Sequence, residues 1–311
     1  MSTTEVIEAV AARLGALAAR DVPIGPRTTY RVGGAAALHV EVLDEAVLAR
    51  VGDAVAESGI EVLVVGNGSN LLVADSGFPG LALTLGGSFA EVHIEAHTVR
   101  AGGASLLPVV ARRSVAAGLT GFEWAVGVPG SIGGAVRMNA GGHGSDMAAS
   151  LARVRVVDLR DGEDGVVHAA ALDLGYRRSV LAPSQLVVWA ELELAAGDPE
   201  VGVRMLSEIV AWRRANQPGG PNAGSVFTNP EGESAGRLIE RAGGKEWRVG
   251  TASVSSKHAN FIQADEGGRA DDVRALMDLV VERVRASWGV ELHPETVLVG
   301  FRPNPQPEIE G

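Results

Sequence analysis

Cysteine is absent from this chain of 311 residues, and lysine is nearly absent, since only Lys245 and Lys257 occur among 27 basic residues. Without cysteine the protein has no disulfide, no thiolate metal ligand and no cysteine nucleophile. The shortage of lysine has its simplest explanation in a compositional bias of the genome. The 41 glycines are spread over many short turns, so we expect no long disordered tract away from the ends.

The chain also lacks any apolar run near the roughly 18 residues that a membrane span requires. Its first residues combine acidic side chains with an amphipathic helical pattern, unlike the basic and then apolar signal of an exported protein. The formal net charge of −11 argues against nonspecific binding to nucleic acid or to an anionic membrane. We therefore expect a cytoplasmic protein with no membrane insertion and no nucleic-acid partner, and we expect a monomer.

The sequence does contain the pattern of an α+β protein with two or three packed units. Apolar residues at helical spacing predict a first helix that ends at residues 21–23. Asp44 is expected to cap a second helix that runs to about residue 58, and residues 61–65 predict a strand. These elements form a β/α unit, which we place at residues 1–85.

A second unit is predicted at residues 86–196. It contains strands, a helix at residues 104–117 and a long glycine-rich stretch at residues 127–144. Alternating apolar residues at 154–159 and 186–194 are typical of sheet strands.

The third unit is predicted at residues 197–302, followed by a disordered tail at 303–311. In its last helix, residues 270–288, an apolar stripe indicates a face that is buried in the core. Two strands are expected to end at Ile262 and Gly300. Two further helices are expected at residues 203–215 and 234–242. A rigid connector is expected between them, at residues 217–221.

Three loops rich in glycine are the first sign of a ligand site, at residues 66–70, 127–134 and 139–146. Glycine lets successive backbone N–H groups converge on an anion, although each loop taken alone has an even chance of being a tight turn. No loop is followed by the G-K-[ST] of a nucleotide triphosphate site, and Leu71 stands where a Rossmann loop requires glycine or alanine. Three such loops together favour a large ligand with a diphosphate, held between two units.

Eight short segments carry a more specific signal. They are residues 28–34 (TTYRVGG), 64–73 (VVGNGSNLLV), 127–135 (GVPGSIGGA), 175–179 (GYRRS), 222–227 (NAGSVF), 235–240 (AGRLIE), 256–262 (SKHANFI) and 294–295 (PE). In this order they resemble the UDP-N-acetylenolpyruvoylglucosamine reductases, which are also called UDP-N-acetylmuramate dehydrogenases. The stretch between Leu194 and Asn222 is too short for the tyrosine-bearing flap of one branch, so the chain resembles the shorter branch.

The resemblance implies a two-part FAD-binding domain of the vanillyl-alcohol-oxidase (PCMH) type and a C-terminal α+β substrate domain. It also implies an oxidoreductase of peptidoglycan precursor synthesis, in which NADPH reduces FAD and the hydride passes to the enolpyruvyl ether of UDP-N-acetylglucosamine enolpyruvate. FAD would lie between the first two units, with its diphosphate on two of the glycine loops. The cofactor-binding residues that it implies are Tyr30, Arg31, Gly66, Asn67, Gly68, Ser69, Asn70, Leu71, Gly130, Ser131, Gly133, Gly134, Asn139 and Gly141.

For catalysis the resemblance implies Arg177 and Glu295 beside the substrate carboxylate and Ser225 as the proton donor. Taken locally, each has a structural alternative: a surface ion pair for Arg177, a loop cap for Ser225 and a solvated strand end for Glu295. The resemblance to the family favours the catalytic roles over these structural alternatives. Contacts to the substrate are implied for Tyr176, Arg213, Asn229 and Lys245. The histidines show no metal-ligand spacing, so we expect no metal.

Two departures from the family affect the anion contacts. Asn216 and Thr228 stand where many relatives carry lysine, and Arg213 and Arg214 are near enough in sequence to substitute. Two other functions remain open, because a shared fold does not fix a reaction. One is an FAD-dependent alcohol or aldonolactone oxidase, and the other is a flavin-binding or nucleotide-sugar-binding protein without catalysis.

Overall fold

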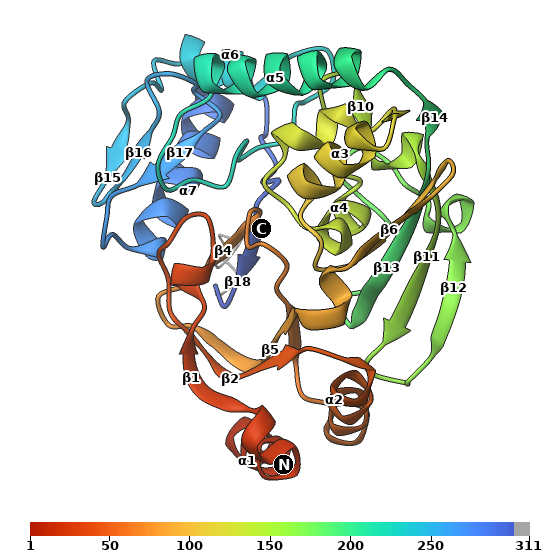
Figure 1. Cartoon of the computed structure of the whole chain (residues 1–311). Coiled ribbons are helices and arrows are strands. Elements are labelled where there is room, and N and C mark those ends of the chain that lie inside the picture. The colour runs from red at the N-terminus through yellow and green to blue at the C-terminus, as the bar shows by residue number, and fades with distance from the viewer. Residues whose placement is uncertain (302–311) are drawn as a thin grey trace.

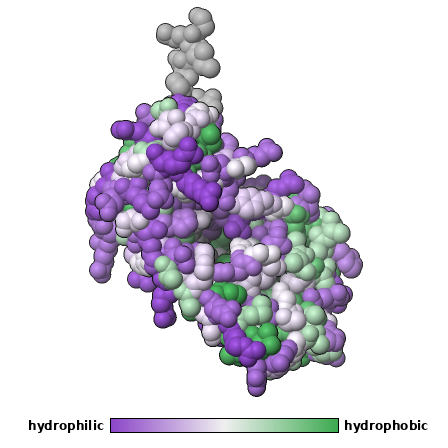
Figure 2. Space-filling model, turned by 90° about the horizontal axis from the view of Figure 1, so that it is seen from above, coloured by the Kyte–Doolittle hydropathy of each residue, from purple (hydrophilic) through white to green (hydrophobic). Residues whose placement is uncertain are grey.

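A computed structural model describes residues 1–301, so the tail predicted at 303–311 lies outside the described residues. The described chain forms three packed units, and helix α5 (Pro199–Asn216) lies across the top of the molecule (Figure 1). The face seen from above is largely hydrophilic, with hydrophobic residues gathered in smaller patches (Figure 2). No helix among residues 1–301 is both long enough and apolar enough to cross a membrane.

The first unit consists of α1 (Thr3–Leu14), β1 (Ala19–Pro23), β2 (Ala35–Val42), α2 (Glu45–Ser58), β3 (Val62–Val64) and β5 (Phe78–Leu85). The sheet has the order β1-β2-β5-β3, in which β1 is antiparallel to β2 and the other pairs are parallel. Asp44 caps α2 as predicted, because its carboxylate accepts a hydrogen bond from the N–H of Val47. Residues 21–23, expected to end the first helix, belong to the edge strand β1, and the helix already ends at Leu14.

The second unit consists of β6 (Val92–Glu95), β7 (Thr98–Gly102), α3 (Leu107–Ala116), α4 (Ile132–Met138), β11 (Leu151–Asp158), β12 (Asp164–His168) and β13 (Gln185–Glu193). Its five strands form an antiparallel sheet in the order β12-β11-β13-β7-β6. The loop predicted at 127–134 ends early, because residues 132–134 already belong to α4. Ser131 caps this helix, and Ile132, Ala135 and Val136 bury one of its faces.

Two short strand pairs complete this region. They are β8 (Leu119–Thr120) with β14 (Ala195–Ala196), and β9 (Gly141–Gly142) with β10 (Ser145–Asp146). Helix α5 packs against α3 and the 3-10 segment Glu123–Gly127, and its Leu206 belongs to the core of the second unit. The sequence placed this helix in the third unit, and the boundaries near residues 85 and 196 stay predictions.

The third unit consists of α6 (Ala235–Arg241), β15 (Arg248–Val249), β16 (Ala252–Val254), β17 (Ile262–Ala264) and α7 (Ala270–Trp288). The predicted stripe of α7 is confirmed, because Val273, Leu276, Val280 and Val284 are all fully buried. Full burial of such a side chain contributes roughly 1.5–3 kcal/mol relative to exposure. Ile262 begins a strand, whereas the sequence predicted that a strand ends there.

A parallel pair of short strands joins the third unit to the first. β4 (Leu71–Val73) pairs with β18 (Val297–Val299), and the N–H of Val297 donates to the carbonyl of Asn70 over 2.9 Å. The strand predicted to end at Gly300 is therefore only three residues long. Pro294 precedes it and makes an isolated bridge with Phe227, and the pairing does not extend further because the N–H of Val226 donates to the carbonyl of Asn260.

A carboxylate from the first unit also caps the longest helix of the third. The residue before α7, Arg269, provides no capping side chain. Instead, Asp75 accepts hydrogen bonds from the N–H groups of Ala270 (3.0 Å) and Asp271 (3.3 Å). The cap satisfies helix N–H groups across the junction between the two units.

Replacing Asp75 with alanine is therefore expected to lower the free energy of unfolding by about 1–2 kcal/mol, the usual effect of losing an N-cap. Urea denaturation of the purified protein measures this change. Asp278→Ala is the matched control, because it removes an acid that pairs with the partly exposed Arg274 one turn earlier in the same helix. Such a pair contributes about 0.2–0.5 kcal/mol, so equal losses in the two variants would contradict the capping role.

Candidate functional site

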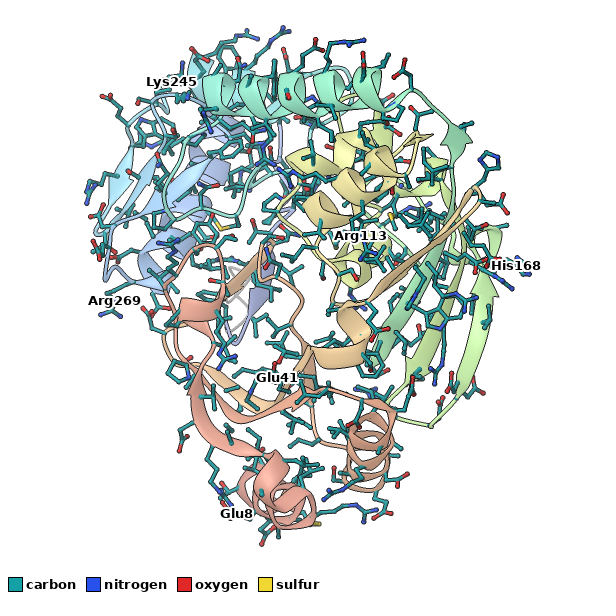
Figure 3. The ribbon with its side chains drawn as sticks, viewed as in Figure 1. Glu8, Glu41, Arg113, His168, Lys245 and Arg269 are labelled. Atoms are coloured by element: carbon teal, nitrogen blue, oxygen red, sulfur yellow. The ribbon has the colours of Figure 1, made fainter. Side chains whose placement is uncertain are left out.

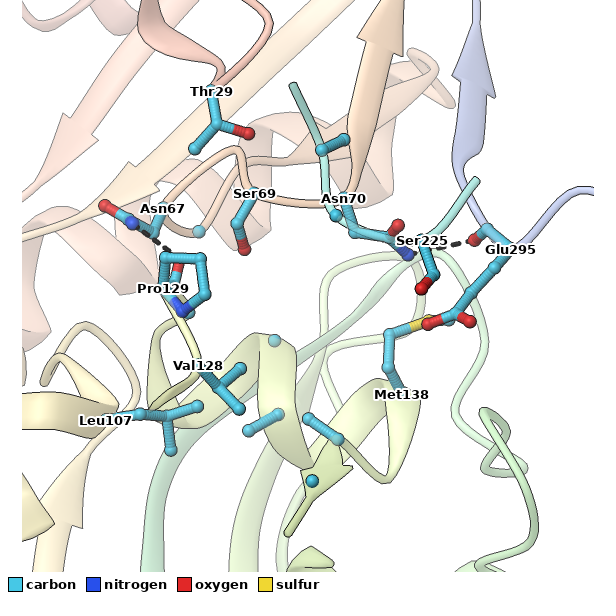
Figure 4. Close-up of a pocket in the computed structure, with 18 of the residues that line it drawn as sticks. Thr29, Asn67, Ser69, Asn70, Leu107, Val128, Pro129, Met138, Ser225 and Glu295 are labelled. Atoms are coloured by element: carbon cyan, nitrogen blue, oxygen red, sulfur yellow. Dashed lines mark hydrogen bonds between the residues drawn. The ribbon is translucent and has the colours of Figure 1, made fainter. Parts of the chain in front are cut away.

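A cavity of about 290 Å³ opens where the three units meet. The first unit contributes residues 66–71, the second contributes residues 127–131 and the β9–β10 hairpin, and the third contributes Ser225 and Glu295 (Figure 4). All three predicted glycine loops therefore line one cavity, in which residues 66–70 and 127–131 face each other. Asn67 joins them directly, because its Nδ2 donates to the carbonyl of Pro129 over 2.7 Å.

A second cavity of about 230 Å³ lies against the same two loops. It shares Gly66, Asn67, Ser131 and Gly134 with the first cavity. The two cavities lie on either side of this pair of loops. They suit a long ligand whose middle part lies between the loops and whose two ends occupy the two cavities.

The loop at residues 66–70 has free hydrogen-bond donors. None of its five backbone N–H groups has an acceptor within residues 1–301. In the facing loop, by contrast, the N–H groups of Ile132 and Gly133 donate to the carbonyls of Ser105 and Gly103. The first loop is therefore the one that can cradle a phosphate, because an anion would satisfy donors that the protein leaves unpaired.

Glycine is required at two positions of this loop. A Cβ at Gly66 would lie 2.5 Å from the Ser131 hydroxyl oxygen, so a side chain at residue 66 would displace the hydroxyl that caps α4. Gly68 has φ +61° and its Cβ would lie 2.6 Å from the carbonyl oxygen of Arg27. The left-handed backbone and the close contact both favour glycine at position 68.

Ser225 is held by the extended segment that follows it, Val226–Phe227. Asn260 clamps Phe227 through both of its side-chain atoms, since Nδ2 donates to the Phe227 carbonyl (2.8 Å) and Oδ1 accepts from its N–H (3.0 Å). The N–H of Glu295 donates to the carbonyl of Val226 over 2.7 Å. These bonds place the side chains of Ser225 and Glu295 at the same end of the cavity (Figure 4).

Glu295 is also tied to the loop of the first unit. Its carbonyl accepts a hydrogen bond of 3.0 Å from Nδ2 of Asn70 (Figure 4). Its carboxylate is mostly buried, and this burial raises the pKa of Glu295 while the charge of Arg177 acts in the opposite direction.

Arg177 reaches the same end of the cavity from the second unit. Its Nε lies 2.7 Å from Oε1 of Glu295, but the N–H is poorly aligned, so the contact is an ion pair without a regular hydrogen bond. Its Nη2 donates to the carbonyl of Gly141 over 3.2 Å. Arg177 has φ +56°, an unusual backbone for arginine, and residues in such conformations are frequent at functional sites.

Most of the predicted site residues line these cavities. In the first cavity are Gly66, Asn67, Gly68, Ser69, Asn70, Leu71, Gly130, Ser131, Gly134, Gly141, Arg177, Arg213, Ser225 and Glu295. Gly133 lines the second cavity. Asn139 and Tyr176 lie on the other side of Arg177, in an open hollow of about 410 Å³.

The remaining predicted residues lie away from these three cavities. Tyr30 is wholly buried in the core of the third unit, and its hydroxyl has no hydrogen-bond partner within residues 1–301. Arg31 is exposed, and Asn229 accepts a hydrogen bond from the N–H of Ala235 at the start of α6. Lys245 lies at the outer edge of the molecule, where its Nζ is 2.7 Å from Glu240 (Figure 3).

The cavity also contains residues that the sequence did not single out as site residues. Gln217 and Asn222 belong to the connector and to the NAGSVF segment, so the motifs already pointed to their neighbourhood. His143 lies in the third glycine loop, where it was considered only as a metal ligand. Thr29, Pro129 and Phe261 lie in three of the family segments but were not singled out within them, and Met138 lies outside those segments.

Comparison with known proteins relates both halves of the chain to described families. Residues 36–165 match the FAD binding domain, and residues 216–299 match the C-terminal domain of UDP-N-acetylenolpyruvoylglucosamine reductase. A reductase of this name from Heliobacterium modesticaldum is 45% identical over 283 residues, covering 89% of each chain. Another, from Synechococcus sp. (strain CC9311), is 44% identical, covering 91% of this chain and 93% of its own length.

A solved structure agrees with these similarities. The crystal structure of UDP-N-acetylenolpyruvylglucosamine reductase from Thermus caldophilus superposes with a TM-score of 0.79 at 36% sequence identity. The match covers 90% of this chain and 98% of that one.

Proposed function

Since this chain belongs to the UDP-N-acetylenolpyruvoylglucosamine reductase family, we propose that it uses NADPH and FAD to reduce UDP-N-acetylglucosamine enolpyruvate to UDP-N-acetylmuramate. The family, the α+β fold with its FAD-binding domain and the oxidoreductase class predicted from the sequence are confirmed. The route of the hydride, the choice of NADPH, the role in peptidoglycan synthesis and the roles of individual residues are the proposal.

The two cavities fit an extended dinucleotide. The free N–H groups at residues 66–70 would hold the diphosphate, and the two cavities would take the ends. Gly66 and Gly68 bring the main chain close to the ligand, where a side chain would occupy the space. When bound, FAD would supply the hydride that originates from NADPH.

The chain itself must stabilise charge and deliver a proton. Hydride addition to the enolpyruvyl group develops negative charge towards the substrate carboxylate, and the Arg177 guanidinium is placed to stabilise it. A positioned donor on such a developing charge contributes about 3–4 kcal/mol. Glu295 orients Arg177 through the ion pair, and its partly buried carboxylate keeps the local charge balanced.

Ser225 is proposed as the acid that protonates the neighbouring carbon. A free serine hydroxyl is a poor acid, so it can serve only where its target is strongly basic and the hydroxyl is held in line. The bonds from Asn260 and Glu295 to the Val226–Phe227 backbone supply that constraint. Such acid catalysis is typically worth roughly 10²–10⁴-fold in rate.

The observation that carries the proposal is the convergence of Arg177, Ser225 and Glu295 on the first cavity. The loop at residues 66–70, with its free N–H groups, lines the same cavity and is called the donor-rich loop below. An anaerobic two-step mixing experiment tests the function. NADPH should bleach the flavin absorbance, and UDP-N-acetylglucosamine enolpyruvate should then restore it. A flavin that NADPH reduces but that this substrate does not reoxidise would refute the proposed reaction.

The same experiment separates the two other functions. An alcohol or aldonolactone oxidase would consume oxygen with its substrate and would not need NADPH. A binding protein would show neither flavin reduction by NADPH nor reoxidation. The carboxylate–guanidinium pair and the serine in the cavity favour the reductase over both.

Gly68→Ala should weaken FAD binding by about tenfold or more, because the new Cβ meets the Arg27 carbonyl and the left-handed backbone is strained. Titration of FAD into the apoprotein, followed by flavin fluorescence, measures this effect. Gly52→Ala in α2 is the control, since a Cβ there meets no atom within 4 Å. If both variants keep wild-type affinity, the loop is not the cofactor cradle.

The proposal also places the protein in the cytoplasm, because UDP-sugars and NADPH are soluble nucleotides. It further includes a monomeric state. Sedimentation analysis of the holoenzyme tests the monomer.

A further inference from the structure

Arg177 stands at the tip of a tight turn with an unfavourable backbone. The backbones of Gly175 and Arg178 bond each other in both directions, over 3.1 and 3.3 Å, so Tyr176 and Arg177 form the two residues of the tip. Arg177 has φ +56°, a left-handed conformation that arginine rarely adopts. Such a conformation persists only where the surrounding structure holds it.

Asn139 provides a support at the base of this turn. It is only 4% exposed, and its Nδ2 donates to the carbonyl of Gly175 over 3.0 Å and to Oδ2 of Asp146 over 3.1 Å. Its Oδ1 accepts from the N–H of Ala148 over 2.9 Å. Both hydrogens of the side-chain amide are therefore bonded to protein atoms, which leaves no donor of this amide for a ligand.

The segment that follows Asn139 also holds the guanidinium of Arg177. The carbonyl of Gly141 accepts a hydrogen bond of 3.2 Å from Nη2 of Arg177. Gly141 pairs with Asp146 in the β9–β10 hairpin, and Asp146 is the residue that Asn139 bonds. Asn139 is thus connected to the backbone of Arg177 through Gly175 and to its guanidinium through the hairpin.

The backbone of Asn139 is itself firmly placed. Asn139 ends α4 with a left-handed φ of +39°, which asparagine tolerates better than most residues. The helix before it is anchored in the core, where Ile132, Ala135 and Val136 are buried. A side chain on such an anchored element can fix the geometry of a neighbouring functional group.

We propose that Asn139 is a positioning residue for Arg177, which it directs towards Glu295 through the Gly175 carbonyl and the β9–β10 hairpin. The inference rests on the function proposed above, because that function gives Arg177 its task in the second half-reaction. It differs from the cofactor contact that the family resemblance implies for Asn139.

Replacing Asn139 with glycine tests this role, because glycine adopts the left-handed backbone without strain and removes all three side-chain bonds. Flavin reoxidation by the enolpyruvyl substrate should slow by roughly 10- to 100-fold, since a small displacement of a catalytic group can cost about 10²-fold. Flavin reduction by NADPH, and the Kd of FAD for the apoprotein, should stay nearly unchanged. Asp21→Gly is the matched control, because exposed Asp21 in β1 has the same left-handed backbone, with φ +50°.

A double variant distinguishes positioning from general structural support. If Asn139 acts through Arg177, adding Asn139→Gly to Arg177→Met should slow reoxidation by no more than about twofold beyond Arg177→Met alone. Losses that multiply in the double variant, or an unchanged rate in Asn139→Gly alone, would overturn the proposal. A loss of FAD affinity with a normal rate at saturating FAD would also overturn it, because Asn139 would then act at the cofactor.

Asp146→Ala is the second variant, in case Asn139→Gly does not fold. It removes the bond from Asn139 to the hairpin and keeps the bond to Gly175. Its loss of reoxidation rate should be smaller, and it should likewise nearly vanish in the Arg177→Met background. A loss that persists in that background would count against positioning.

Hydrogen–deuterium exchange separates this proposal from the proposed function, because it needs no reaction. In Asn139→Gly the amides of residues 175–178 should exchange about tenfold faster, as for the loss of a buried hydrogen bond, and Asp21→Gly should leave them unchanged. Unchanged exchange in Asn139→Gly would overturn the positioning role. Faster exchange, in a protein whose unsubstituted form does not reduce the substrate, would support the contact and refute the proposed function.

Discussion

Replacing Ser225 with alanine should leave the reduction of the flavin by NADPH nearly unchanged and slow its reoxidation by the enolpyruvyl substrate by about 10²-fold or more. The reason is that the proposed proton transfer belongs only to the second half-reaction. The hydroxyl is also small, and the backbone bonds at Val226 and Phe227 do not involve it. The conformation of this segment should therefore survive.

Stopped-flow absorbance of each half-reaction, recorded anaerobically, measures the two rates separately. Ser207→Ala is the control, because this exposed serine donates only to the carbonyl of Val203 within α5. Equal slowing of both half-reactions in Ser225→Ala would point to a general disturbance of the site and refute the proton-donor role.

Arg177→Met should lower kcat/KM for the enolpyruvyl substrate by roughly 10²–10³-fold, the effect of removing one donor from a developing charge. The ion pair with Glu295 predicts a second effect, on stability. The charge of Arg177 lowers the pKa of Glu295, which burial raises. Without Arg177, this pKa should therefore rise further above its ordinary value. The buried carboxyl should then bind a proton that it would otherwise release.

The sign of the pH effect follows from linkage. A carboxyl whose pKa is higher in the folded than in the unfolded protein binds more protons when folded, so stability falls as pH rises between the two pKa values. The fall begins at the unfolded pKa and is complete above the folded one. Arg177→Met should extend this fall to higher pH than in the unsubstituted protein, as urea denaturation over a pH series would measure.

The double variant Arg177→Met with Glu295→Gln separates the two effects. Removing both charges should abolish the additional pH-dependent loss of stability, because no buried carboxyl remains. The kcat/KM should stay low, because the cation is still missing. Recovery of activity in the double variant would contradict a direct role for Arg177 in the reaction.

The sequence predicted the parts of the site that depend on local backbone chemistry. The glycines at 66 and 68 signal a loop that approaches another chain segment or a ligand closely, and Asp44 signals a helix start. Arg177, Ser225 and Glu295 were a different case. Nothing local distinguishes them from an ion pair, a loop cap or a strand end, so only the family resemblance singled them out, and their roles stay predictions.

The parts that the sequence did not predict depend on packing between distant segments. The glycines around α4 suggested a loop, but the buried face of Ile132 and Val136 stabilises a helix there. Asn139 was assigned to the cofactor, whereas its side chain bonds Asp146, Gly175 and the N–H of Ala148 and so supports the turn before Arg177. Its role in cofactor binding stays a prediction.

The pairing of β18 with β4 has a consequence for how the protein is made. The strand beside the donor-rich loop, and the glutamate that precedes it, come from residues 295–299, which a ribosome adds after nearly all other described residues. The first two units can emerge and fold earlier, but their shared hollow lacks one wall until this late segment docks. Nascent chains arrested before residue 295 should therefore fold in part and yet be unable to carry out the reaction.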